Sequence, residues 1–193
     1  MAGSAINEES NVDVRIQVVI EHENARHVET IAVFRRDELQ PETLGLTLAE
    51  SQDLLANLQS LVVSQQVAEY NHQQHYCPDC GAERSRKGQT QITYRTAFGQ
   101  FKLDSPRFYT CDCHPRPECS ESPLARLLSE RTSPELLYLQ TKWASLMSYG
   151  MTADLLNDVL PVDVCDSSIR HNVQQVAQRS EDELEPEQVI FVD

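Results

Sequence analysis

The order of apolar and polar residues along the chain predicts a pair of strands followed by a long helix. Apolar residues alternate with polar ones through residues 12–20, and a second extended run covers residues 27–34, so the two segments predict an antiparallel hairpin. Thr47 and Glu50 have the spacing of a capping box, in which a hydroxyl and a carboxylate satisfy free backbone amides at the start of a helix. The apolar stripe that follows predicts a helix that reaches about Tyr70 and packs on the hairpin, with a dimer seam as the alternative use of the stripe.

A second group of strands is expected in the middle of the chain. Alternating residues predict a strand over residues 92–96, a turn over residues 98–100 and a return strand over residues 101–103. Proline has no amide hydrogen to donate, so Pro106 is expected to interrupt the pairing. Residues 107–110 are then expected to form a third strand.

The remaining pattern is helical. Ser133 is a good N-cap, and Pro134 follows it at the first helical position, which proline favours. Gly150 is expected to end that helix, Thr152 to cap a short second one, and residues 166–184 to form a third. The last two helices are compatible with a helix-turn-helix.

Four cysteines in two closely spaced pairs indicate a metal site. Cys77 and Cys80 form a C-x2-C pair followed by Gly81, which lets the backbone double back closely. Cys111 and Cys113 form a second pair about 30 residues later. A structural zinc ion takes four such ligands in a closed tetrahedron, so we expect one zinc ion to join the two pairs across the intervening hairpin.

The second pair has C-x-C spacing, which departs from the usual C-x2-C, so His114 and Cys119 remain alternative ligands. No thioredoxin-like βαβ pattern surrounds the cysteines, which disfavours a redox role. Neither a histidine triad nor a neighbouring general base accompanies them, so the zinc is expected to be structural. Cys165 has no nearby partner in the sequence and is expected to be a buried thiol.

Together these patterns predict an α+β fold with an N-terminal hairpin and long helix, a zinc-ribbon-like β segment and a helical, helix-turn-helix-like region. Five segments are expected: residues 1–11 as a disordered start, 12–76 as a ββα cap, 77–122 as the zinc-ribbon-like segment, 123–185 as a helical DNA-binding region, and 186–193 as a terminal strand.

The composition bounds the class of protein. A hydrophobic fraction of 40% and a charged fraction of 24% are those of a globular domain. No apolar run reaches the roughly 18 residues of a spanning helix, and the acidic start MAGSAINEES lacks a secretory pattern. We therefore expect a cytoplasmic protein, where thiols stay reduced and clustered cysteines favour metal binding.

The net charge of −14 argues against a protein that simply coats DNA, because phosphate affinity depends on Lys and Arg. The charge is uneven, however, since residues 77–142 hold 10 basic and 8 acidic side chains. This segment is either a DNA-contacting surface or merely near neutral. Six of its cations are the candidate phosphate contacts: Arg84, Arg86, Lys87, Arg95, Lys102 and Arg107.

The last predicted helix has a polar face opposite its apolar stripe. Residues in the N-terminal half of a recognition helix reach base edges or phosphates, although a solvated face has the same pattern. The candidates are Ser168, Arg170, His171 and Gln174.

Several stretches of the chain carry a family resemblance: LGLTLAESQDLL, VAEYNHQQHYCPDCG, TAFGQFKLDSPRFYTCDC, SPLARLLSERTSPELLYLQTKWASLMSYGMTADLLNDVLP and VIFVD. They resemble the N-terminal half of ISKra-type insertion-sequence transposases of the DDE class, from about residue 12 onward. The resemblance implies a bacterial, nucleoid-associated protein whose front part recognises double-stranded DNA at transposon ends. It also implies that Asp193 aligns with the first acid of an RNase H-like catalytic domain.

Two-metal phosphoryl chemistry needs two or three carboxylates, and the sequence supplies one of them in Asp193. We therefore expect a truncated, non-catalytic DNA-binding portion of a transposase, inactive alone. The alternative is a zinc-stabilised interaction module that forms homo-oligomers or inhibits full-length transposase through mixed oligomers.

Overall fold

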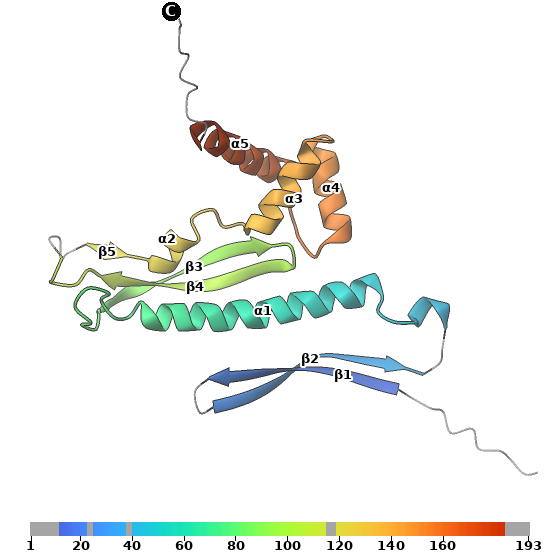
Figure 1. Cartoon of the computed structure of the whole chain (residues 1–193), viewed down its shortest axis with the longest axis horizontal. Coiled ribbons are helices and arrows are strands. Elements are labelled where there is room, and N and C mark those ends of the chain that lie inside the picture. Colours follow the sequence, from blue (N-terminus) through green and yellow to red (C-terminus); the bar gives the residue numbers. More distant parts are fainter. Residues whose placement is uncertain (1–11, 23–24, 38–39, 115–118, 184–193) are drawn as a thin grey trace, which may run out of the picture. The chain divides into compact units, whose positions relative to one another are not determined.

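The computed structural model describes residues 12–22, 25–37, 40–114 and 119–183. The expected disordered start at residues 1–11 and the expected strand at residues 186–193, with Asp193, lie outside these ranges. The described chain is α+β, as the sequence predicted, with two antiparallel sheets and five α-helices (Figure 1). It divides into two compact units at a point within the longest helix, between Val63 and Ser64.

The first unit contains a hairpin and the first half of a long helix. Strands β1 (Val12–His22) and β2 (Ala25–Arg36) pair antiparallel, with an irregularity in register after Ile16. A short 3-10 turn, η1 (Pro41–Thr43), leads into helix α1 (Leu48–Gln73). The predicted hairpin and long helix are therefore confirmed.

The capping box at the start of α1 is present as predicted. The amide of Glu50 donates to Thr47 Oγ1 over 3.2 Å, and Glu50 Oε2 accepts from the amide of Thr47 over 3.0 Å. Arg36, at the end of β2, adds a bond that the sequence did not indicate, because it donates to the same Glu50 oxygen over 2.8 Å. The Arg36 guanidinium lowers the pKa of the Glu50 carboxyl most, and the Thr47 amide lowers it further. A charged pair thus joins the hairpin to the helix start.

The second unit begins with the rest of α1 and continues into a three-stranded sheet of order β3-β4-β5. Its strands are β3 (Arg86–Thr96), β4 (Gly99–Tyr109) and the short β5 (Ser120–Glu121). The tight turn between β3 and β4 falls at residues 97–98, one residue before the predicted 98–100, and Gly99 at the start of β4 adopts φ +136°.

The expected break at Pro106 is wrong, because β4 runs unbroken from Gly99 to Tyr109 and Pro106 pairs with Gln89. The Pro106 carbonyl accepts a hydrogen bond from Ser122 Oγ over 3.2 Å. Within a strand the N–H and C=O of one residue share a side, so the missing amide of Pro106 points away from β3 and costs no bond between these strands. The third strand is consequently β5, rather than residues 107–110.

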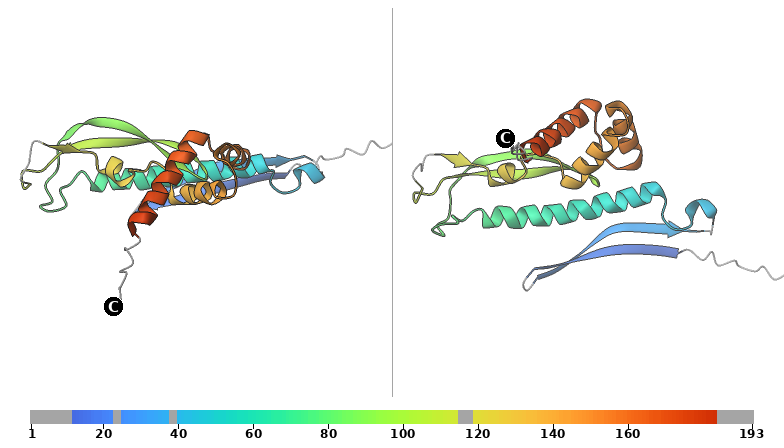
Figure 2. Two further views of the ribbon diagram at one scale, coloured as in Figure 1. Left: turned by 90° about the horizontal axis from the view of Figure 1, so that it is seen from above. Right: turned by 45° about the horizontal axis from the view of Figure 1, so that its top comes forward.

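Four helices follow: α2 (Pro123–Leu127), α3 (Pro134–Ala144), α4 (Tyr149–Val159) and α5 (Asp166–Glu183). Ser133 caps α3, as predicted, by accepting from the amide of Leu136. Helices α3, α4 and α5 pack on one another in a bundle (Figures 1 and 2). The loop between α4 and α5 covers residues 160–165, which is longer than the turn of three or four residues usual in a helix-turn-helix.

The expected boundary between α3 and α4 is wrong. Helix α3 ends at Ala144, and Ser148 rather than Thr152 caps α4, by accepting from the amide of Met151 over 3.3 Å. Thr152 is instead fully buried inside α4, and its hydroxyl donates to the Ser148 carbonyl over 3.0 Å. Gly150 lies in the first turn of α4, so it does not end a helix.

The helical bundle has its own core of five buried apolar residues: Leu136, Ala153, Leu156, Val164 and Ile169. Each fully buried Leu or Ile stabilises the folded state by roughly 1.5–3 kcal/mol. In the sheet the buried apolar side chains are those of Ile92, Leu103 and Phe108. None of the described helices combines the length and the apolar character needed to cross a membrane.

Candidate metal centre and charged surfaces

A tight turn between α1 and β3 presents the first pair of thiols. An isolated bridge between Tyr76 and Glu83 closes the turn. Within it, the Gly81 amide donates to the Cys77 carbonyl over 2.9 Å, and Gly81 adopts φ +73°. That left-handed conformation favours glycine, as the sequence predicted, and it brings the Cys80 side chain around toward Cys77.

The second pair of thiols follows the end of β4 and meets the first pair. Cys77 Sγ lies 3.5 Å from Cys113 Sγ, and Cys80 Sγ lies 3.4 Å from Cys111 Sγ. All four sulfur atoms lie within 4.8 Å of one another. The structure therefore brings together the four residues that the sequence selected.

These distances fit a metal site better than a pair of disulfides. A disulfide holds its sulfurs at about 2.05 Å, and all four cysteines are free thiols. A tetrahedral ion with metal–sulfur bonds of about 2.3 Å separates its sulfurs by roughly 3.8 Å, which lies within the observed spread. The cluster is thus pre-arranged to hold one metal ion.

The electrostatics of the cluster favour a cation at its centre. The amides of Cys80 and then Asp79 point at Cys77 Sγ and lower the pKa of this thiol to about 6. Contact with the Cys77 sulfur raises the pKa of Cys113 well above its usual value, and burial raises it further. The pocket therefore stabilises a first thiolate but resists a second negative charge, which a bound cation offsets.

His114 and Asp79 form an overlapping second group with Cys77 and Cys113. His114 Nε2 lies 3.8 Å from Cys77 Sγ and 3.3 Å from Asp79 Oδ2. Asp79 thus orients the imidazole beside the thiols, an arrangement typical of groups that surround a metal ligand. Cys119 is exposed and belongs to neither group that the described residues form.

Arg84 is not a DNA contact, contrary to the sequence prediction, because its side chain is only 4% exposed. Its Nη1 donates to Glu121 Oε1 over 2.7 Å, while its Nε and Nη2 donate to the Gln74 carbonyl. The guanidinium carbon also lies 5.0 Å from the centre of the Phe108 ring. Arg84 therefore holds the end of α1, the cysteine turn and β5 together.

The other predicted ribbon cations are more accessible. Arg86, Lys87 and Lys102 are exposed, whereas Arg95 and Arg107 are half-buried. The register of the hairpin places Arg95 opposite Gln100 and Lys102 opposite Thr93, so both cations lie on one face of the sheet. At the far end of β3, the Lys87 ammonium lies 5.4 Å from the centre of the exposed Tyr109 ring. The Arg107 guanidinium bonds Ser120 Oγ over 3.0 Å.

The candidates on α5 form a separate group. Arg170, His171 and Gln174 are exposed, but the Ser168 hydroxyl donates to the Cys165 carbonyl over 2.8 Å. Ser168 therefore supports the helix start, and the prediction that it contacts DNA is not favoured by this position.

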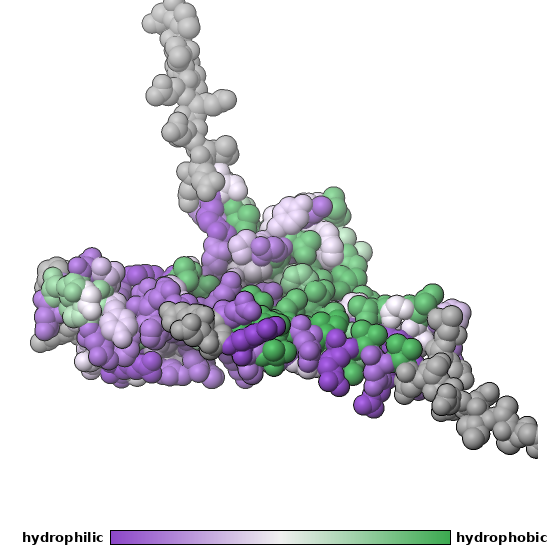
Figure 3. All heavy atoms as spheres, turned by 60° about the horizontal axis from the view of Figure 1, so that its bottom comes forward, coloured by the Kyte–Doolittle hydropathy of each residue, from purple (hydrophilic) through white to green (hydrophobic). Residues whose placement is uncertain are grey.

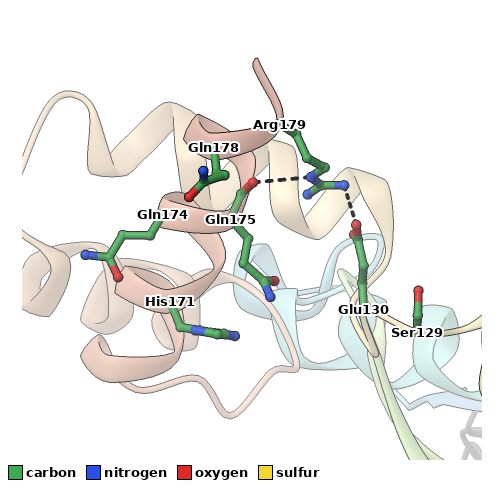
Figure 4. Close-up of a pocket in the computed structure, with 7 residues that line it drawn as sticks. All are labelled: Ser129, Glu130, His171, Gln174, Gln175, Gln178 and Arg179. Carbon is green, nitrogen blue, oxygen red and sulfur yellow. Dashed lines mark hydrogen bonds and ion pairs between the residues drawn. The ribbon is translucent and has the colours of Figure 1, made fainter. Parts of the chain in front are cut away.

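A hollow of about 450 Å³, bordered by polar residues, lies beside this face of α5 (Figure 4). Its lining residues are Ser129, Glu130, His171, Gln174, Gln175, Gln178 and Arg179. Arg179 donates to Glu130 and to the Gln175 carbonyl, so its charge is already partly neutralised. His171 and Gln174 are candidates that the polar face of the predicted helix had already indicated, whereas Glu130 comes from a distant loop that the sequence pattern does not place.

Cys165 is exposed, so the expectation of a buried thiol is wrong. Hydrogen bonds from Ser167 and Ser168 at the start of α5 lower the pKa of Cys165 to about 7. The thiolate is the nucleophile, so a lowered pKa makes Cys165 more reactive near neutral pH than an ordinary thiol.

We expect iodoacetamide to alkylate Cys165 with a rate whose midpoint lies near pH 7, measured by peptide mass spectrometry of the native chain. The variant Ser167→Ala/Ser168→Ala removes the stabilising hydroxyls and is expected to move the midpoint upward. A native midpoint near pH 9, insensitive to both substitutions, is the result that contradicts this account.

Comparison of the chain with models of known protein families and with curated proteins gives no match.

Proposed function

We propose that this chain is a zinc-stabilised, non-catalytic DNA-binding module of the kind found in the N-terminal part of an insertion-sequence transposase. The observation that carries the proposal is the four-thiol cluster, with every sulfur within 4.8 Å of the others, at the base of a hairpin that exposes cations. The family resemblance supplies the expected target, double-stranded DNA at transposon ends in the bacterial nucleoid.

Zinc is the metal that suits the cluster best. Four thiolates in a closed tetrahedral arrangement are the usual ligands of structural zinc, and zinc brings no redox chemistry. Cys77, Cys80, Cys111 and Cys113 would hold the ion, and His114 with Asp79 would adjoin it. When bound, the ion would supply folding free energy to the ribbon rather than a reactive water.

The DNA contacts divide into two kinds. Arg86, Lys87 and Lys102 are exposed cations on the ribbon and would neutralise phosphates, which positions the protein without reading sequence. His171 and Gln174 on α5 expose groups that can bond base edges; an amide such as that of Gln pairs well with adenine. We assign no chemical step, because both metal-ligand groups among the described residues are built on cysteines rather than on carboxylates.

We expect the triple variant Arg86→Ala/Lys87→Ala/Lys102→Ala to lose most of its affinity for a random-sequence duplex. Each lost phosphate contact lowers the slope of log affinity against log salt by about 0.9, so the slope should become shallower by roughly 3. Fluorescence anisotropy of the zinc-loaded chain over a salt series measures both quantities.

Lys142→Ala is the matched control, because Lys142 is an exposed cation of α3 that contacts the Tyr138 ring instead of lining the ribbon. It should leave affinity and slope nearly unchanged. If wild-type protein does not bind duplex at low salt, or if the triple variant keeps its full salt slope, the DNA-binding proposal fails.

A further inference from the structure

The first unit leaves most of its apolar side chains uncovered. Among its described residues, Val63 is the one apolar side chain that is buried. Ten large apolar side chains of this unit are exposed: Val12, Val14, Val19, Val28, Val33, Leu44, Leu46, Leu48, Leu55 and Val62. Figure 3 shows green, apolar side chains interleaved with purple, polar ones on this face of the molecule. Exposed apolar side chains in this number are typical of a surface that a partner covers.

Among the described residues, the sheet of this unit consists of β1 and β2 alone, so both of its edges are open. A two-stranded hairpin is at best marginally stable in water. Strands of 11 and 12 residues with unpaired backbone groups are templates for a further strand. Backbone pairing along an edge would give this unit the additional strands that it lacks.

The sequence of β1 is complementary to itself when two copies run antiparallel about Val18. In that register Ile16 lies opposite Ile20 of the second copy, and Val18 lies opposite its own counterpart. These three side chains are half-buried and share one face of the strand, so the pairing extends the face that is already partly covered.

The same register sets one pair of opposite charges against each other. Arg15 lies opposite Glu21 of the second copy, and the two-fold axis generates this pair twice. Among the described residues, no ion pair is recorded for Arg15, and Glu21 has only a long contact with Arg26, 3.9 Å, between exposed side chains. Opposite charges that face each other across an antiparallel pair are stabilising.

We infer that the β1 edge binds β1 of a second copy of this chain, in antiparallel register about Val18, and so forms a four-stranded sheet across a two-fold axis. A two-fold interface of this type is self-complementary and closed, which prevents further strand addition at β1. The axis is perpendicular to the sheet, so the two α1 helices lie on the same face of it. The inference rests on the first unit alone and is independent of DNA binding.

The full zinc-loaded chain is expected to sediment as a dimer in analytical ultracentrifugation. Arg15→Glu places like charges opposite each other twice, so the dimer should weaken on the order of tenfold to a hundredfold. Glu21→Arg should weaken it similarly. The double variant Arg15→Glu/Glu21→Arg restores both pairs with reversed sign and should restore the dimer.

Glu29→Arg is the matched control, because Glu29 is an exposed acidic residue of β2 that lies opposite Val18 rather than opposite a charged side chain. It should leave the dimer intact. Hydrogen exchange should also show concentration-dependent protection of β1 amides in wild-type protein. A monomer at all concentrations, a dimer that Glu29→Arg breaks, or a failure of the double variant to restore association would overturn the inference.

Discussion

Removing the proposed zinc ion is expected to unfold the segment of β3, β4 and β5 while helices α3, α4 and α5 stay folded. The sheet buries three large apolar side chains, those of Ile92, Leu103 and Phe108, which is too few to hold a hairpin of this length alone. Zinc contributes roughly 10–16 kcal/mol to folding in small domains of this type. The bundle keeps its own core when the ion leaves.

Hydrogen exchange measured by mass spectrometry, with and without a strong chelator, tests this expectation. Amide protection should disappear across residues 77–114 and persist across residues 134–180. Metal analysis of the same sample should account for one zinc ion per chain before treatment and none afterwards.

Substitution of thiols provides a second test without a chelator. Cys77→Ser/Cys80→Ser removes half of the ligand set and should reproduce the exchange pattern of the metal-free protein. Cys119→Ser/Cys165→Ser removes two exposed thiols outside the cluster and should leave the pattern unchanged. Full amide protection of residues 77–114 in protein shown to be free of zinc would refute the proposal that zinc stabilises this segment.

The features that the sequence predicted correctly are those with local signals. The capping box of α1 depends on residues three positions apart, and the cap of α3 depends on Ser133 and Pro134. The metal cluster is a special case, because a tetrahedral site has to gather four thiols wherever they lie in the chain. The C-x2-C turn with Gly81 identified the first pair, and the close C-x-C spacing indicated the second, with His114 and Cys119 as alternatives until the sulfur positions were known.

The incorrect predictions concern residues whose role depends on distant partners. Pro106 is tolerated in β4 because its carbonyl side faces Ser122, which the local pattern does not reveal. Thr152 and Ser148 are equally good caps in isolation, and the burial of Thr152 decides between them. An arginine in a basic segment looks like a phosphate contact until its partners are known, as Arg84 shows.

Arg84→Ala is expected to destabilise the second unit by about 1–3 kcal/mol, the usual cost of leaving a buried acceptor without its donor. The substitution removes both donors of the Gln74 carbonyl. Glu121 loses one of its two cationic partners and keeps its ion pair with Arg126. It also removes the cation packed on Phe108. Arg84→Lys should recover little of the lost stability. A lysine ammonium cannot reproduce the planar guanidinium that bonds the Gln74 carbonyl and the Glu121 carboxylate at the same time.

Urea unfolding of the zinc-loaded protein, followed by circular dichroism and by tryptophan fluorescence, measures the effect. Arg86→Ala removes an exposed cation two residues away and should change the free energy of unfolding by less than about 0.5 kcal/mol. The double variant Arg84→Ala/Glu121→Gln should lose less free energy of unfolding than the sum of the losses in the two single variants, because the two residues share one interaction. If Arg84→Ala is no more destabilising than Arg86→Ala and instead lowers DNA affinity, Arg84 contacts phosphate, as the sequence alone suggested, and the stabilising role assigned to it is refuted.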